Sequence, residues 1–432
     1  MLAQDTDDNV ISLQYGKYPE TNFLKLILPS SYHIQTAMLH DESIAFQNRT
    51  LDAQKTNNAL PDAGRVHGGI IASSLDSLGK LSERETGESK YLSHDKNHSV
   101  SDISLLDFTG SDSSELAILP SANALNFPAN VLDRMPDVFD YARGVKTTES
   151  ETKSSDLGNF PYNTQSLYPL VIFLHGGFWK NQWTIKNSFD ISFLRKLADQ
   201  CGVFVAAIEY RRRDDEPGIW SQSVSDILDA TRLLENLALR NVLPIDATKV
   251  FLIGHSAGGH LALLCGEMLA FLCNTSKINP GLKLAREFLA QQAAFHYIKP
   301  VLVIGIAPVT DLIKGYEGKL GDAESGVHAC EGYMKSSPYD SEYAMNEYKM
   351  ASPCSYLPNL VPQIIVGGMQ DLDIPLWMLQ EYKHIADSTR GSSVSMKILP
   401  DADHFDLING SNMRCYDAVE NEIKRIVSSL AA

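Results

Sequence analysis

The sequence has no run of apolar residues that approaches the roughly 18 needed for a membrane-spanning helix. Its opening segment, MLAQDTDDNV, carries acidic residues where a secretory signal peptide carries basic ones, and no apolar segment follows it. We therefore expect a cytoplasmic protein that has no membrane partner.

Basic side chains are also scarce. The chain has 37 Lys and Arg residues against 53 Asp and Glu residues, which gives a formal net charge of −16. Nucleic acids and anionic membranes both select for basic patches on their protein partners. We therefore expect neither as a main partner, and the oligomeric state is left open.

The cysteines lack the spacing that metal sites and redox motifs require. None of the six forms a CxxC pair, and their surroundings are apolar or mixed. This pattern favours buried, reduced thiols. It predicts no metal ion, and nothing else in the sequence implies an organic cofactor. The cysteines are residues 201, 265, 273, 330, 354 and 415.

Sustained hydrophobic periodicity is missing from residues 31–167. This stretch is rich in Ser, Asp, Asn and Thr, and it holds 19 acidic residues against 11 basic ones. We expect it to be a mostly disordered, low-complexity acidic insertion. Two less polar segments within it, LAILPSANALNF and NVLDRMPDVFDYARG, could each form a short helix or a docking segment.

Strand and helix patterns alternate on the C-terminal side of this insertion. Unbroken apolar runs separated by amphipathic segments predict a mostly parallel, doubly wound α/β sheet covered on both faces. We assign residues 168–432 to the catalytic domain, and residues 1–30 to its first strands. The expected strands cover 170–174, 203–210, 249–256, 299–309, 362–368 and 393–400. The expected helices cover 188–202, 222–240, 258–272, 375–388 and 413–430.

The motif GHSAG carries the most specific chemical signal. It fits G-x-S-x-G, with Ser256 between an expected strand and an expected helix. In that context a sharp turn exposes the serine hydroxyl as a nucleophile, and small neighbours let the backbones approach closely. The amide of Ala257 would then lie at a helix N-terminus, where it can stabilise a negative charge.

A nucleophilic serine needs a base and an orienting acid. His404 follows the last expected strand, within DADHFDLI, and we predict that it is the base. Asp371 follows the preceding strand and is the preferred acid. Asp373 remains an alternative acid, although it could instead cap the helix that begins near Pro375. We expect the neighbouring His255 and His260 to be structural.

The stretch HGGFW follows the first strand of the alternating part. A tetrahedral intermediate carries an oxyanion, and a glycine-rich loop in this position can donate backbone amides to it. We predict that Gly176, Gly177 and Phe178 form an oxyanion hole with Ala257, with Phe178 standing where an HGGG motif has its third glycine.

Aromatic residues near this loop, together with an arginine run, are further candidates. We expect Trp179 and Trp220 to line a substrate pocket suited to an aryl leaving group. The run Arg211 to Arg213 is followed by three acidic residues and is interpreted as a salt-bridged loop, with anion binding as the alternative. Residues 312–348 and 282–297 are expected to contribute to a lid.

Together these residues resemble the α/β-hydrolase superfamily, and within it the kynurenine formamidase (arylformamidase) and HGGxW-esterase group. The resemblance extends over about 240 residues from Tyr168. It implies that an ester or aryl formamide is hydrolysed through an acyl-enzyme, and that residues 31–167 are inserted between the second and third strands. The matching motifs are HGGFW, IEYRR, GHSAGGHLAL, GIAPVTDL, ASPCSYLP and HFDLI.

Two other functions fit the same residues. One is a carboxylesterase that acts on short acyl esters or on methyl esters of the prenylcysteine type. The other is a catalytically inactive hydrolase fold that serves as a binding protein. The intact order of Ser256, Asp371 and His404 along the chain argues against the inactive form.

Overall fold

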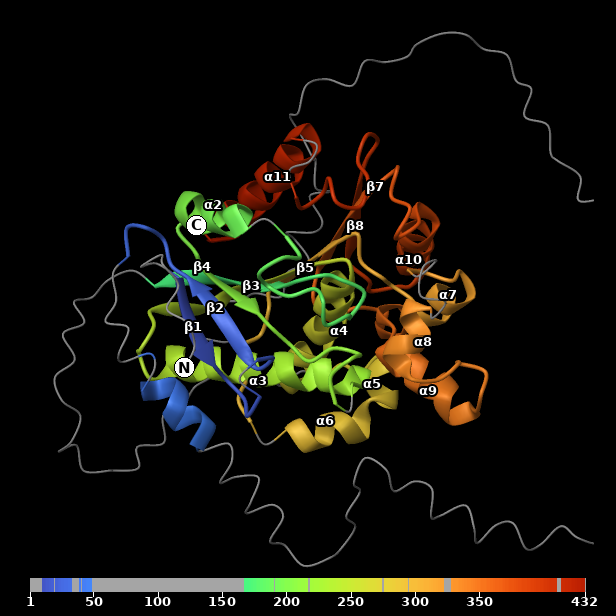
Figure 1. The fold of residues 1–432 in the computed structure, drawn as a ribbon, viewed down its shortest axis with the longest axis horizontal. Coiled ribbons are helices and arrows are strands. Elements are labelled where there is room, and N and C mark those ends of the chain that lie inside the picture. The colour runs from blue at the N-terminus through green and yellow to red at the C-terminus, as the bar shows by residue number, and fades with distance from the viewer. Residues whose placement is uncertain are drawn as a thin grey trace, which may run out of the picture. The chain divides into compact units, whose positions relative to one another are not determined.

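The central feature of this computed structural model is an eight-stranded sheet with the order β1-β2-β4-β3-β5-β6-β7-β8 (Figure 1). The structure describes residues 10–48 and 167–431, apart from gaps at 19, 33–38, 40, 190, 217, 274–275, 294, 322–327 and 410–412. The strands are β1 Val10–Gln14, β2 Phe23–Ile27, β3 Tyr168–Leu174, β4 Phe204–Ile208, β5 Ile245–His255, β6 Leu302–Ile306, β7 Gln363–Gly368 and β8 Val394–Leu399.

Strand direction divides the sheet into two parts. β1 pairs antiparallel with β2, and β2 pairs antiparallel with β4. All pairings from β4 through β3 to β8 are parallel. The carboxyl ends of the parallel strands therefore meet at one edge of the sheet, which is where α/β folds place their sites.

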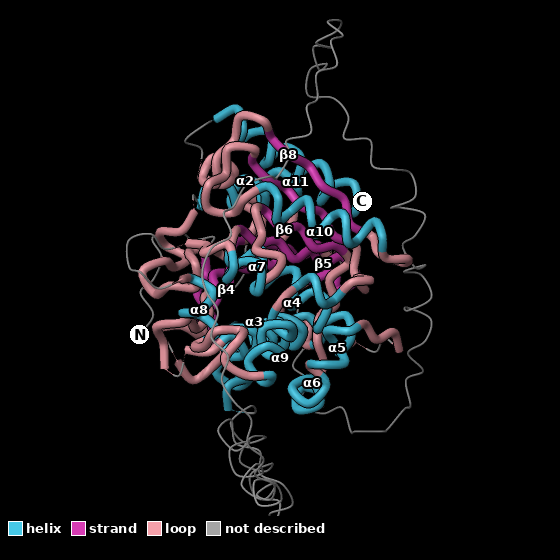
Figure 2. The backbone as a smooth tube through the Cα atoms, turned by 90° about the vertical axis from the view of Figure 1, so that its right-hand side faces the viewer, coloured by secondary structure: helices cyan, strands magenta, loops and turns pink. Residues whose placement is uncertain are grey.

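Helices cover both faces of the sheet, as Figures 1 and 2 show. Alternate residues of β3 enter two separate apolar cores: Leu170 and Ile172 face α3, α4 and α10, whereas Val171 and Phe173 face α2 and α11. Burial on both faces explains why the strands are unbroken apolar runs. The helices are α2 Ile191–Cys201, α3 Trp220–Leu239, α4 Ala257–Leu272, α5 Pro280–Leu284, α6 Arg286–Gln292, α7 Leu312–Glu317, α8 Ala329–Met334, α9 Glu342–Ala351, the 3-10 helix η2 Pro353–Tyr356, α10 Leu376–Ser388 and α11 Met413–Ala431.

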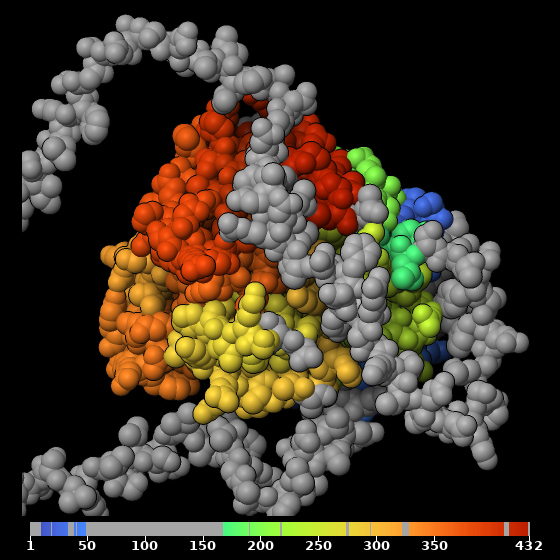
Figure 3. Space-filling model, turned by 180° about the vertical axis from the view of Figure 1, so that it is seen from behind, coloured from blue at the N-terminus to red at the C-terminus, as the bar shows by residue number. Residues whose placement is uncertain are grey.

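The segment between α4 and β7 adds short helices outside the two layers. The stretch 282–297, expected as one helix, forms α5 and α6 instead. Asn279 caps α5 by accepting a hydrogen bond from the Leu282 amide. α5 contacts α9, and in the view from behind the yellow and orange segments lie against each other (Figure 3).

The N-terminal part stays ordered further than the sequence predicted. Residues 41–48 form a helix, although the predicted insertion began at residue 31. Leu39 and Phe46 are buried in the main core, and the Gln47 side-chain amide donates a hydrogen bond to the Gln14 carbonyl over 2.8 Å. The remainder of the expected insertion, with its two less polar segments, lies outside the described residues.

Two further expectations from composition bear on the described residues. Within them, no helix is both long enough and apolar enough to cross a membrane. All six cysteines are free: Cys265, Cys330 and Cys415 are buried, and the other three are half-buried.

Candidate functional site

Ser256 occupies a strained turn between β5 and α4. Its backbone has φ 55° and ψ −120°, in the left-handed half of the φ range that a non-glycine residue rarely enters. A Cβ at Gly254 would lie 2.1 Å from the Gly258 carbonyl oxygen, and a Cβ at Gly258 would lie 2.1 Å from the Leu174 carbonyl oxygen. The glycines of GHSAG are therefore required by close backbone approach.

His404 and Asp371 form a buried hydrogen-bonded pair. His404 Nδ1 lies 2.8 Å from Asp371 Oδ2, and both side chains are almost fully buried. The second oxygen, Asp371 Oδ1, accepts hydrogen bonds from the amides of Asp373 (2.9 Å) and Ile374 (2.7 Å). Three donors thus fix the carboxylate, and they orient it toward the imidazole.

Asp373 contributes its backbone amide to this arrangement. Its half-buried carboxyl has a raised pKa, mainly because of desolvation, although nearby His404 acts in the opposite direction. The ligand atoms of Asp371, Asp373 and His404 all lie within 4.8 Å of one another, a spacing that could hold a metal ion. His404 Nδ1 is already bonded to Asp371, so the donor set is arranged as an acid–base pair.

His255 joins the His404 loop to the serine turn. Its Nε2 lies 3.1 Å from the His404 carbonyl oxygen, so Nε2 carries the proton and donates it. The two imidazole rings lie 4.6 Å apart between centroids. Burial, reinforced by the charge of His404, holds the pKa of His255 well below its usual range. His255 is therefore a neutral structural link, as its position in the motif suggested.

The loop that starts at His175 lies against the same turn. A Cβ at Gly176 would lie 2.9 Å from the His255 carbonyl oxygen and 3.0 Å from Ser256 Cβ. Gly177, Phe178 and Trp179 all have positive φ, at 117°, 49° and 56°. The structure therefore brings the predicted oxyanion loop, the serine turn and the His404 loop together at one edge of the sheet.

The two tryptophans lie in the packed interior. Trp179 is 1% exposed and stacks on Tyr333 with ring centroids 4.4 Å apart. Trp220 is 4% exposed, and its Nε1 donates to Glu347 Oε2 over 2.7 Å. Their burial argues against the expected aromatic wall. Half-buried Phe178 packs against Gly321, where an added Cβ would lie 2.4 Å from the Phe178 ring.

The arginine run pairs with carboxylates. Arg211 bonds both oxygens of Asp226, and Arg212 Nη1 lies 2.5 Å from Glu209 Oε1. Arg213 lies 3.5 Å from Asp214. These contacts agree with the salt-bridged interpretation and leave no support for the anion-binding alternative.

Sequence reasoning did not identify Glu209, which lies beneath the oxyanion loop and bonds both His175 and Arg212. The signal was a single acidic residue directly after the apolar run VFVAAI. A buried charge is costly unless it is paired, so that residue pointed to a partner that the local sequence could not name.

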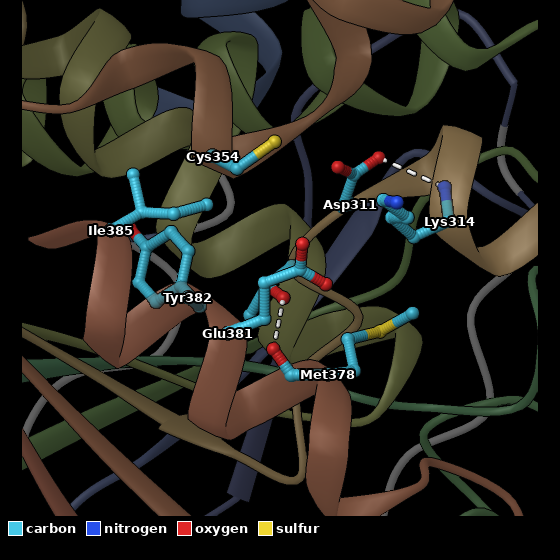
Figure 4. A pocket seen from close by; sticks show the side chains of 8 residues that line it. Asp311, Lys314, Cys354, Met378, Glu381, Tyr382 and Ile385 are labelled. Carbon is cyan, nitrogen blue, oxygen red and sulfur yellow. Dashed lines mark hydrogen bonds between the residues drawn. The ribbon is translucent and has the colours of Figure 1, made fainter. Parts of the chain in front are cut away.

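A small hollow lies away from these residues, between the start of α7, η2 and α10 (Figure 4). Its volume of about 10 Å³ has room for about one water molecule. Neither Ser256 nor His404 lines it. The lining residues are Thr310, Asp311, Lys314, Cys354, Met378, Glu381, Tyr382 and Ile385.

Comparison with a protein-family model gives a match to BD-FAE over residues 159–382, just over half of the 432-residue chain. The match includes Ser256 and Asp371 and ends before His404. Among curated proteins, neutral cholesterol ester hydrolase 1 of Mus musculus is 25% identical over 134 residues, which is 30% of this chain and 32% of the relative. Its Rattus norvegicus counterpart is 24% identical over 132 residues, 30% of this chain and 31% of the relative. The chain thus spans about a third of the length of these relatives.

Solved structures with related folds include several esterases. A truncated carbohydrate esterase from gut microbiota has a TM-score of 0.46 and 16% identity, covering 62% of this chain and 87% of that one. An inhibited esterase B from Lactobacillus rhamnosis has a TM-score of 0.46 and 22% identity, covering 62% of this chain and 79% of that one.

Proposed function

Because the chain belongs to the BD-FAE family of α/β-hydrolase-type esterases, we propose that it is a serine hydrolase that cleaves small carboxylic esters through an acyl-enzyme. The observation that carries this proposal is the 2.8 Å hydrogen bond between His404 and Asp371, at the sheet edge that also holds the strained Ser256 turn. This geometry supplies a nucleophile, a base and an orienting acid in one place.

In this mechanism the Ser256 hydroxyl attacks the acyl carbon. His404 accepts the serine proton through Nε2 and returns it to the leaving alcohol, while Asp371 holds Nδ1–H and stabilises the imidazolium. A water molecule then attacks the acyl-enzyme with the same base, and the carboxylic acid leaves. The three hydrogen bonds to Asp371 keep the imidazole in the required tautomer.

The oxyanion is stabilised by backbone amides on two sides. The Ala257 amide begins α4, where N–H groups are unpaired and the helix dipole favours negative charge. Amides of the loop that contains Gly176, Gly177 and Phe178 complete the hole. The contact between Gly176 and Ser256 supports this assignment, because it places the loop beside the nucleophile.

Apolar side chains are exposed beside the acid and the base. Leu372, between Asp371 and Asp373, is 93% exposed, and Phe405 is 44% exposed with its ring edge-on to His404. These side chains favour an apolar acyl or leaving group. The HGGFW motif keeps an aryl formamide as the second candidate substrate.

Turnover of p-nitrophenyl acetate and of N-formylkynurenine separates the two substrates. We expect fast ester cleavage, and negligible formamide hydrolysis would remove the formamidase candidate. A fluorophosphonate probe should label the parent protein and should not label Ser256→Ala. Failure to label the parent protein would contradict the proposal and favour an inactive binding protein.

A further inference from the structure

The oxyanion loop is held in a conformation that its own residues do not favour. Three consecutive residues have positive φ, and two of them, Phe178 and Trp179, carry side chains. Such conformations persist only where the surrounding structure enforces them. Contacts from outside the loop must therefore hold its backbone in place.

One carboxylate ties both ends of this loop. Glu209 directly follows β4, and its Oε1 lies 3.2 Å from His175 Nε2, at the start of the loop. Its Oε2 accepts a hydrogen bond from the Ile185 amide over 2.9 Å, at the loop's end. Arg212 Nη1 bridges Glu209 Oε1 and the Trp183 carbonyl oxygen, at 2.5 and 2.6 Å.

The neighbouring residue adds a second hold on the loop. The Tyr210 hydroxyl donates to the His175 carbonyl oxygen over 2.6 Å, and its ring stacks on the imidazole with centroids 4.6 Å apart. The Glu209 carbonyl oxygen accepts a hydrogen bond from the Tyr15 hydroxyl. Glu209, His175 and Tyr210 are each at most 1% exposed, so water does not compete for these bonds.

Charge is part of this arrangement. Burial alone would raise the pKa of Glu209, but His175, Arg212 and the Ile185 amide outweigh it, and the pKa is lowered overall. Glu209 is therefore ionised and accepts from three donors. Glutamine has the same shape, but its amide nitrogen donates, so at least one of these donors would lose its acceptor.

We propose that Glu209 is a positioning residue that clamps the loop from His175 to Ile185, so that the amides of Gly177 and Phe178 point at the oxyanion. This inference rests on the proposed serine-hydrolase function. Because the oxyanion forms only in the transition state, weakening the clamp should lower kcat and leave KM nearly unchanged.

The test is Glu209→Gln in the full chain, assayed with p-nitrophenyl acetate. We expect kcat to fall by about 10- to 100-fold, with KM within about threefold of the parent value. Inhibition by trifluoroacetophenone, which forms a tetrahedral adduct with the serine, should weaken by a factor similar to the loss in kcat. A merely structural role would not move that inhibition constant.

Glu267→Gln is the matched control. Glu267 is also fully buried and accepts several hydrogen bonds, but its partners are Asn279, Leu360, Val361 and Gln363, away from the loop. Measured below the melting temperature of each variant, Glu267→Gln should keep the parent kcat. If Glu209→Gln keeps kcat within about twofold, or if both variants lose it equally, the clamp is refuted.

Tyr210→Phe covers the case in which Glu209→Gln does not fold. It removes only the hydrogen bond to the His175 carbonyl, and we expect a several-fold loss in kcat with unchanged KM. Parent-like kcat in this variant would overturn the proposal. Ser256→Ala separates this from failure of the proposed function, because retained activity there would refute the serine mechanism whatever the Glu209 result.

Discussion

At the scale of single residues, two carboxylates lie near His404, and only one of them bonds it. Asp371 accepts the imidazole Nδ1–H and two backbone amides, whereas Asp373 donates its amide to Asp371. Sequence spacing could not separate the two, because they stand two positions apart in the same turn. Their different contacts give them different expected effects on catalysis.

We expect Asp371→Asn to lower kcat by on the order of 10⁴, because an amide facing Nδ1 favours the wrong imidazole tautomer. Asp373→Asn should stay close to the parent kcat, since its backbone amide remains in place. Steady-state kinetics on p-nitrophenyl acetate, with circular dichroism to check folding, provide the measurement. An equal loss in both variants would contradict the assignment of Asp371 as the triad acid.

At the scale of elements, a buried carboxylate joins α4 to the loop that precedes β7. Glu267 accepts hydrogen bonds from the Leu360 amide over 2.7 Å and from the Gln363 side chain over 3.2 Å. Burial raises its pKa to about 8, against the opposing effect of these donors. The carboxyl is therefore protonated in the folded state over a pH range in which the unfolded chain is ionised.

This difference predicts a pH dependence of stability. Because the pKa of the folded state lies above the unfolded value of 4.5, Glu267 contributes fully below about pH 4.5, and its contribution is lost as pH rises toward about 8. The free energy of unfolding of the parent, minus that of Glu267→Gln, should fall by at most about 1.4 kcal/mol per pH unit. Urea titrations between these pH values measure it, and a rising difference would contradict the sign.

The sequence predicted most elements of the fold because their signals are local. The strands β3 to β7 are continuous apolar runs, and the turn at Ser256 is marked by glycines that close packing demands. The burial of Trp179 was not predictable, because its stacking partner Tyr333 lies far along the chain. The role of Glu209 was hidden for the same reason, since the loop ends that it bonds precede it by 34 and 24 residues.

At the scale of the whole molecule, the N-terminal hairpin and the helix over residues 41–48 belong to the same core as the catalytic residues. Phe46 is buried in the main core, and Glu42 pairs with Arg240 over 3.1 Å. The predicted boundary at residue 31 therefore falls before structure that the core uses. A deletion that follows the predicted insertion would remove this helix along with the segment beyond it.

Two deletions test where the hydrolase core begins and ends. Replacing residues 51–165 with a flexible Gly/Ser linker keeps the 41–48 helix, and we expect this protein to fold and to retain the parent kcat. Replacing residues 31–167 removes Leu39 and Phe46, and large buried side chains typically contribute about 2–5 kcal/mol each. That variant should melt at a clearly lower temperature by calorimetry. Equal melting temperatures would show that the helix adds nothing to the core, and aggregation of the shorter deletion would show that the core depends on the replaced segment.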